Sequence, residues 1–228
     1  MNPVQRRGPD RVALAGAAIF GAASAVLAYL SLSLGLNFPL IPYLQFDLGE
    51  VAILLAFFIF GPIPALEASV VEFLALMLAG VNAPWGPILK VCATTSTVVG
   101  MWAGVKAASY LRRTSVGSLV GFGTVTGAAV RAVALTFPNY YLIVFLYTVP
   151  AIVSYVSAPF ASVGVSITDS NLLLWVLAFT AVFNVIQLTF VSLISYAVLR
   201  LRRISQLSAG GRSPWFVRLA KDAAADPR

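Results

Sequence analysis

Several polar side chains that could recognise a ligand stand inside long apolar segments of this sequence. Asn184 and Gln187 are three residues apart, so on a helix they share one face. Asn139 and Tyr140 follow Pro138 near the end of another apolar run. Amides and aromatic rings with few charges beside them suit a neutral, planar molecule that forms hydrogen bonds. The same amides could instead bond a neighbouring helix, as amides at membrane depth often do.

Ionisable residues inside the apolar segments form a second group, which includes Glu72, Lys90 and Arg131. A charge at membrane depth costs about 2.5–3.5 kcal/mol on insertion scales, so each one needs a reason. We expect Glu72 and Arg131 either to pair with each other or to contact a ligand. An alternative from another functional class is an intramembrane enzyme that uses Glu72 or Asp47 as an acid or base, although no acid pair or nucleophile with a base is visible.

The residue inventory excludes several kinds of chemistry. The sequence has no histidine and a single cysteine, Cys92. A metal site built from histidine and cysteine, a histidine-based triad and a disulfide within the chain are therefore not available. Cys92 lies inside an apolar run, and we expect it to be a small buried residue.

The composition identifies the elements that must position these side chains. Of the 228 residues, 60% are hydrophobic and only 10% are charged, and the mean hydropathy is +0.91. Soluble domains carry about 25% charged residues. The apolar runs are continuous rather than alternating, which indicates membrane-spanning helices and not barrel strands. The sequence therefore predicts an all-α, multi-pass membrane protein.

Four apolar runs are long enough to cross a bilayer alone, namely 12–34, 87–111, 116–137 and 172–199. A fifth run, 48–80, is interrupted by the stretch GPIP, whose two prolines disrupt a helix. This run is either one kinked helix or a hairpin of two short helices.

The basic residues favour the hairpin. They cluster before the run 12–34, between the runs 87–111 and 116–137, and after the run 172–199. The loops at the other ends of these runs carry no lysine or arginine. The clusters are Arg6, Arg7 and Arg11, then Arg112 and Arg113, then Arg200, Arg202 and Arg203. Because basic residues favour the cytoplasmic side, six spans with both termini inside accommodate all of them. We expect residues 1–11 to be a cytoplasmic N-terminus, 12–203 the membrane domain and 204–228 a loosely ordered basic cytoplasmic tail.

Two segments that connect the expected spans have distinctive sequences. Tyr140–Phe160 is apolar but divided by prolines, and we expect it to be an outward extension or a re-entrant cap. The loop NFPLIPYLQFDLGE, 37–50, joins the first two spans, and its Asp47 is suited to cap the next helix.

Small residues repeat at four-residue spacing in the first span, at Ala13, Ala17, Gly21 and Ala25. Such a stripe lets another helix approach closely. That helix could belong to the same chain or to another membrane subunit.

Four stretches resemble the substrate-binding S components of energy-coupling-factor (ECF) transporters, most closely the riboflavin-type subfamily. They are PYLQFDLGEV, FGPIPALEASVVEFL, RAVALTFPNYYLIVFLY and FNVIQ. Their order and placement cover about residues 13–200. The sequence departs from the subfamily at Gln187, where its members have a lysine, and after Val71 and Glu72, where they often have a Lys-Asn pair.

The resemblance implies a six-helix subunit of the cell membrane that binds a vitamin, most simply riboflavin, and catalyses nothing. It implies docking of the small-residue stripe on a transmembrane coupling subunit that works with two ATPases. The loop 37–47 would be a lid over a binding site in the outer half of the membrane. The expected ligand-binding residues are Phe38, Tyr43, Leu44, Gln45, Asp47, Glu72, Lys90, Asn139, Tyr140, Asn184 and Gln187. The alternatives are an S component for another vitamin or precursor, and a membrane scaffold without transport.

Overall fold

The structure is a computed structural model and describes residues 11–80, 82–146, 149–201 and 213–225. Its helices are α1 (Arg11–Ser33), α2 (Gly49–Phe60), α3 (Pro62–Leu78), α4 (Trp85–Tyr110), α5 (Val116–Tyr141), α6 (Val149–Ala161), α7 (Leu172–Leu199) and α9 (Trp215–Ala225). A π-helical segment, η1 (Leu142–Leu146), follows α5. Strands β1 (Asn37–Phe38) and β2 (Ile41–Gln45) pair antiparallel between α1 and α2.

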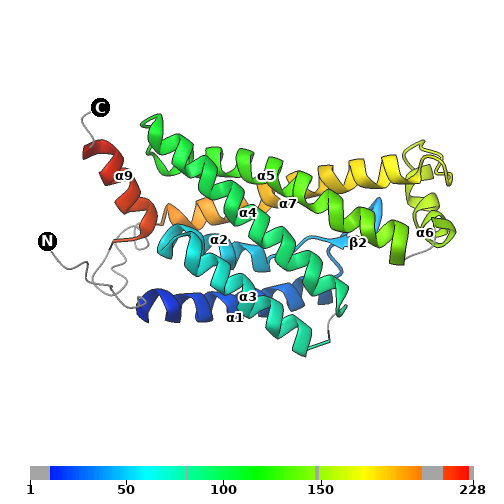
Figure 1. The fold of residues 1–228 in the computed structure, drawn as a ribbon, viewed down its shortest axis with the longest axis horizontal. Helices are drawn as coiled ribbons and strands as arrows, with labels where there is room; N and C mark the ends of the chain where they lie inside the picture. Colours follow the sequence, from blue (N-terminus) through cyan, green and yellow to red (C-terminus); the bar gives the residue numbers. More distant parts are fainter. Residues whose placement is uncertain (1–10, 81, 147–148, 202–212, 226–228) are drawn as a thin grey trace, which may run out of the picture.

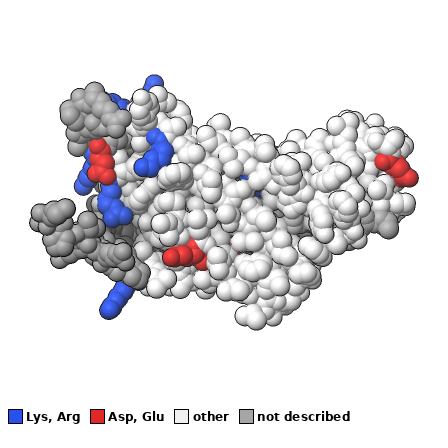
Figure 2. Space-filling view, viewed as in Figure 1, with Lys and Arg blue, Asp and Glu red and all other residues white. Residues whose placement is uncertain are grey.

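Four helices in the described part of the chain are long and apolar enough to cross a membrane, namely α1, α4, α5 together with η1, and α7. The prediction of an all-α membrane protein is therefore confirmed at that level. On the face drawn in Figure 2, most of the surface carries no charge, and Lys and Arg gather at one end. That end holds α9 and the start of α1, whereas α6 lies at the opposite end (Figure 1).

The chain reverses between α2 and α3, which lie side by side (Figure 1). The reversal occurs at Gly61, whose φ of 112° is a conformation that glycine adopts without steric cost. Pro62 then begins α3, a position where its missing N–H is not needed. The predicted interruption of the 48–80 run is thus confirmed, and local residue chemistry explains it.

Of the prolines expected to divide Tyr140–Phe160, Pro150 stands at the start of α6, as predicted, whereas the other two do not break a helix. Pro138 lies inside α5, which continues to Tyr141, and Pro159 lies inside α6. After Tyr141, α5 gives way to the π-helical segment η1. At 13 residues, α6 is about 20 Å long, too short to cross a bilayer core of about 30 Å.

Three other expectations need correction. The loop 37–47 contains a two-stranded hairpin, so the fold is helical with one small β-element. Cys92 is exposed on the outside of α4, because an apolar helix in a membrane presents apolar residues outward as well as inward. The tail expected to be loosely ordered contains α9, while 204–212 and 226–228 lie outside the described residues.

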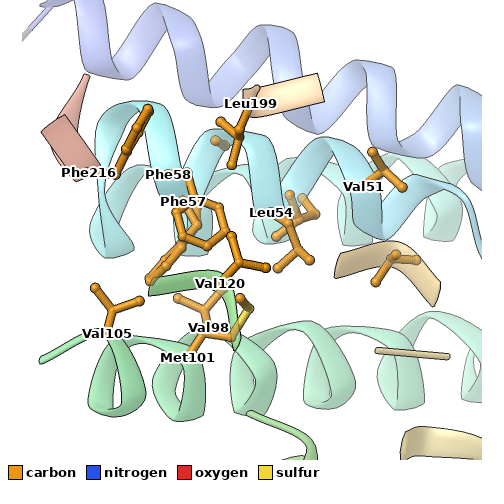
Figure 3. Packing of buried hydrophobic residues seen from close by; sticks show 14 of the residues in the cluster. Val51, Leu54, Phe57, Phe58, Val98, Met101, Val105, Val120, Leu199 and Phe216 are labelled. Atoms are coloured by element: carbon orange, nitrogen blue, oxygen red, sulfur yellow. The ribbon is translucent and has the colours of Figure 1, made fainter. Parts of the chain in front are cut away.

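The larger apolar cluster connects α9 to the membrane helices. Phe57 and Phe58 of α2 lie at its centre and are fully buried, next to Met101 of α4 (Figure 3). Phe216 of α9 joins them and is only 4% exposed. The Trp215 ring lies 5.2 Å from the Phe57 ring, edge to face. The apolar side of α9 is therefore packed on the basic end of the bundle.

Candidate functional site

A cavity of about 180 Å³ lies between the β-hairpin and the helices around it. Seven of the residues expected to bind a ligand line it: Tyr43, Leu44, Gln45, Asp47, Lys90, Asn139 and Asn184. Two further charged residues, Glu50 and Arg131, also line it. The hairpin, α2, α4, α5 and α7 each contribute a polar group, so the cavity is where the polar residues of an otherwise apolar bundle converge.

Arg131 of α5 is the centre of a fully connected polar cluster. Its guanidinium binds Glu50 through two nitrogens, with Nη2 donating to Oε1 at 2.8 Å. Nε donates to Asn184 Oδ1 at 2.8 Å, and Nη1 lies 3.3 Å from Thr97 Oγ1. Arg131 and Glu50 are 3% and 4% exposed. This two-pronged pairing is the geometry in which a buried arginine and a carboxylate best satisfy each other.

Lys90 of α4 lies between two carboxylates in a second cluster. Its Nζ is 2.8 Å from Glu72 Oε1 of α3 and pairs also with Asp47 at the end of the hairpin segment. The predicted pair between Glu72 and Arg131 is therefore wrong. The cause is the rotation of α3, α4 and α5 about their axes, which aims each side chain at a neighbour that the sequence does not identify.

Ser24 of α1 connects this second cluster to the start of α2. Its Oγ contacts the Glu72 carboxylate and lies 2.8 Å from the carbonyl oxygen of Gly49. A hydroxyl group has one proton and donates to one acceptor at a time. Two acceptors therefore compete for this hydroxyl, and the cluster has fewer donors than its acceptors can use.

Residues 37–48, which we call the hairpin segment, contain β1 and β2 and end just before α2. The last two of these residues are hydrogen-bonded to α7 and α1. The Gln187 side chain donates to the backbone carbonyl of Asp47 at 2.8 Å and lies 3.3 Å from the Asp47 N–H. The Leu48 N–H donates to Ser31 Oγ at 3.0 Å. The Asp47 carboxylate also accepts from the Gly49 N–H at 2.7 Å. The N-cap of α2 is Leu48, which makes no side-chain capping bond, so the expected N-capping of α2 by Asp47 is wrong.

Four of the expected binding residues do not line the cavity. Phe38 packs against Phe183, with ring centroids 5.4 Å apart, in the smaller apolar cluster. Tyr140 is 44% exposed on α5. Glu72 and Gln187 contact residues that line the cavity: Glu72 pairs with Lys90, and Gln187 bonds the backbone of Asp47.

The small-residue stripe is used within the chain. Ala17 and Gly21 are buried, and a Cβ built on Gly21 would lie 2.6 Å from Val71 Cβ and 2.7 Å from the Ala68 carbonyl oxygen. These contacts belong to α3. Of the two alternatives, the structure favours close packing of α1 on α3 over docking of these residues on another subunit.

Sequence reasoning missed Glu50, Thr97, Ser24 and Ser31. The available signal was Glu50, which stands three residues after Asp47 and hence on the same side of a helical turn. The others are small hydroxyl residues, which commonly bond their own helix backbone, so their type alone does not mark them.

The cavity is thus lined by the Arg131–Glu50 pair, by Lys90 and by the amide of Asn139. The β-hairpin covers it and is hydrogen-bonded to α7 through Asp47. This arrangement can hold a small polar molecule. Comparisons with protein-family models, with curated proteins and with solved structures found no match to this chain.

Proposed function

We propose that this chain is the substrate-binding subunit of an ECF-type vitamin importer of the cell membrane, with riboflavin as the first ligand to test. The observation that supports the proposal is the cavity under the hairpin. Polar groups from the hairpin, α5 and α7 converge there inside an apolar bundle. A pocket of this kind is the usual form of a small-molecule site.

The hairpin acts as the lid in this proposal. The cavity of about 180 Å³ is smaller than the roughly 300–1,000 Å³ of typical ligand pockets. A vitamin-sized molecule therefore enters only when the hairpin moves. The hydrogen bonds of Gln187 and Ser31 hold the moving segment at its α2 end.

The proposal includes six crossings with both ends in the cytoplasm. It is supported by the position of the basic residues at the end that carries α9 and the start of α1 (Figure 2). The two short helices α2 and α3, of 12 and 17 residues, would then cross as a hairpin. Because α2 is only about 18 Å long, the β-hairpin segment would complete that crossing.

The proposal assigns ATP hydrolysis to two partner ATPases and their coupling to a transmembrane subunit. Because Ala17 is buried and Gly21 packs against α3, that subunit would meet the outward face of α1, where Ala15, Ala18 and Ala22 are exposed. The chain itself would bind and release the vitamin without changing it.

The purified protein gives the direct test. We expect it to carry flavin with a visible absorption band, and riboflavin to quench its tryptophan fluorescence at a one-to-one ratio. Asn139→Ala should weaken this binding by about 5- to 150-fold, the equivalent of 1–3 kcal/mol for one lost buried partner. Thr136→Ala is the matched control, because Thr136 bonds only the Ala132 carbonyl of its own helix.

The two measurements test the identity of the ligand and the importer role separately. Absence of flavin affinity would end the riboflavin assignment. Failure of the chain to co-purify with a coupling subunit and ATPases, when these are expressed together, would end the importer assignment.

A further inference from the structure

The charged residues around the cavity do not balance. Among the described residues, the two clusters hold three carboxylates, Asp47, Glu50 and Glu72, against two cations, Lys90 and Arg131. Glu50 and Arg131 neutralise each other through their two-pronged pair. The unmatched negative charge therefore belongs to Lys90, Asp47 and Glu72, which we call the lysine triad.

The unmatched charge is buried but can be reached from the cavity. Glu72 is 1% exposed, so water does not compensate its charge. Lys90 and Asp47 line the cavity, each with 14% of its side chain exposed. An uncompensated charge in a membrane bundle is costly, and a positive group placed beside Asp47 would remove that cost.

Asn139 provides a second and independent feature of the same cavity. Its side chain is 3% exposed, and its Nδ2 donates to the Leu135 carbonyl at 2.8 Å. That bond fixes the orientation of the amide, since the oxygen would repel the carbonyl. No described residue donates to Asn139 Oδ1. Asn139 lines the cavity, so the cavity offers an acceptor without a described partner, in addition to the unmatched negative charge of the lysine triad beside it.

We infer that the cavity takes a small organic cation that carries N–H donors, such as a protonated amine or an amidinium group. The positive group lies against Asp47 of the lysine triad, and an N–H donates to Asn139 Oδ1. The volume of about 180 Å³ limits the buried part of this ligand to a small head group. The inference rests on the proposed importer function and concerns its ligand. If it holds, the chain binds a cationic vitamin or precursor, the alternative to riboflavin, and the flavin test fails while the importer role stands.

Three probes of similar shape and different charge test the inference on the full chain in lipid nanodiscs. They are benzamidine, a cation, benzamide, which is neutral, and benzoate, an anion. We expect calorimetry to show benzamidine binding at least about tenfold more tightly than benzamide, with no binding of benzoate. Asp47→Asn and Glu72→Gln should each remove this preference. Glu67→Gln should keep it, because Glu67 is an exposed carboxylate on α3 outside the cavity.

The thermal stability of the empty protein is a second measurement. Each of the two neutralising variants should unfold at a temperature equal to or above that of the parent chain, because the unmatched charge is removed. Each variant should thus lose the cation preference without losing stability, which a variant that merely misfolds would not do.

Equal affinity for benzamide and benzamidine, or no binding of benzamidine, would overturn the inference. So would a Glu72→Gln variant that keeps the full preference for the cation, since Glu72 would then already hold a proton. Co-purification with ATPases and a coupling subunit does not depend on any of these results. Loss of the cation preference with retention of that assembly would therefore leave the importer role intact.

Discussion

The two charged clusters beside the cavity use similar residues in different ways. Arg131 has acceptors on three sides, in Glu50, Asn184 and Thr97, and its charge is matched. Lys90 joins two carboxylates from different segments, one of which ends the hairpin. The arginine cluster connects four helices, α2, α4, α5 and α7, whereas the lysine triad connects the hairpin segment to α3 and α4.

This difference indicates a structural role for the cluster around Arg131 and a ligand-binding role for the lysine triad. A fixed, planar guanidinium with matched partners holds helices in one arrangement. An ammonium on a flexible stem, shared by two carboxylates, can keep one partner while it releases the other. We therefore expect substitutions in the arginine cluster to affect folding, and those in the lysine triad to affect binding and the hairpin.

The largest expected effect is that of Arg131→Met. Removing one partner of a buried pair leaves Glu50 as an unmatched charge, and costs about 3–5 kcal/mol. We expect a large loss of folded protein and of the unfolding temperature, measured by thermal unfolding in detergent. Arg113→Met, at an exposed arginine, is the control.

A double variant tests whether the unmatched Glu50 charge causes the loss of stability in Arg131→Met. Arg131→Met combined with Glu50→Gln leaves no buried charge and should recover most of the lost stability. If the double variant were as unstable as the single one, the pair would not be the source of the loss.

Lys90→Met comes next. It leaves Asp47 and Glu72 without their cation, but Asp47 lies at the end of the hairpin segment and can turn toward the cavity. The loss should be smaller, about 1.5–3 kcal/mol, the range for hydrogen bonds to charged groups. Lys106→Met is the matched control on the same helix, at an exposed position. A loss as large as that of Arg131→Met would show that the triad is a support as well.

Gln187→Ala should loosen the hairpin segment and leave the bundle intact. It removes two hydrogen bonds to the Asp47 backbone, worth about 0.5–1.5 kcal/mol each. Hydrogen exchange should rise in residues 37–48 and stay constant in α4. Thr189→Ala, an exposed residue of α7 that bonds only its own helix, serves as the control. Unchanged exchange in 37–48 would remove Gln187 from the proposed lid mechanism.

The smallest expected effect is that of Ser24→Ala, about 0.5–1.5 kcal/mol for one hydrogen bond. Ser24 contacts both Glu72 and the Gly49 carbonyl. The matched control on α1 is Ser33→Ala, which loses only a bond to the Tyr29 carbonyl. Equal unfolding temperatures for the two variants would show that Ser24 does not stabilise the triad.

Features set by local chemistry could be predicted from the sequence. Composition and run length predicted the membrane helices, and the GPIP stretch predicted the break that occurs at Gly61. The position of Asp47 before an apolar helix indicated that it would bond the start of α2; it does bond the Gly49 N–H, although Leu48 is the N-cap. In each case the cause lies within a few residues of the effect.

Features that depend on how helices face one another could not be predicted. Of the two roles expected for Glu72, the pair with Arg131 is wrong, and Glu72 binds Lys90 instead, because helix rotation decides which side chains meet. Pro138 was expected to end a helix, yet α5 continues past it. A proline removes a backbone donor and crowds the preceding turn, but membrane helices tolerate it where neighbouring groups satisfy the freed carbonyl. Ala17 and Gly21 were expected to allow close helix approach, but the sequence did not identify α3 as the helix against which Gly21 packs.

The contact between Trp215 and the α2–α3 turn has a consequence for biosynthesis. A Cβ built on Gly61 would lie 3.3 Å from the Trp215 ring, so the last described helix closes directly over that turn. The ribosome releases α2 and α3 long before it makes α9. During that interval Phe57 has no cover at this end. The α2–α3 turn is therefore covered only after α9 has been made, and a polypeptide that stops before α9 would leave the aromatic surface around Phe57 uncovered.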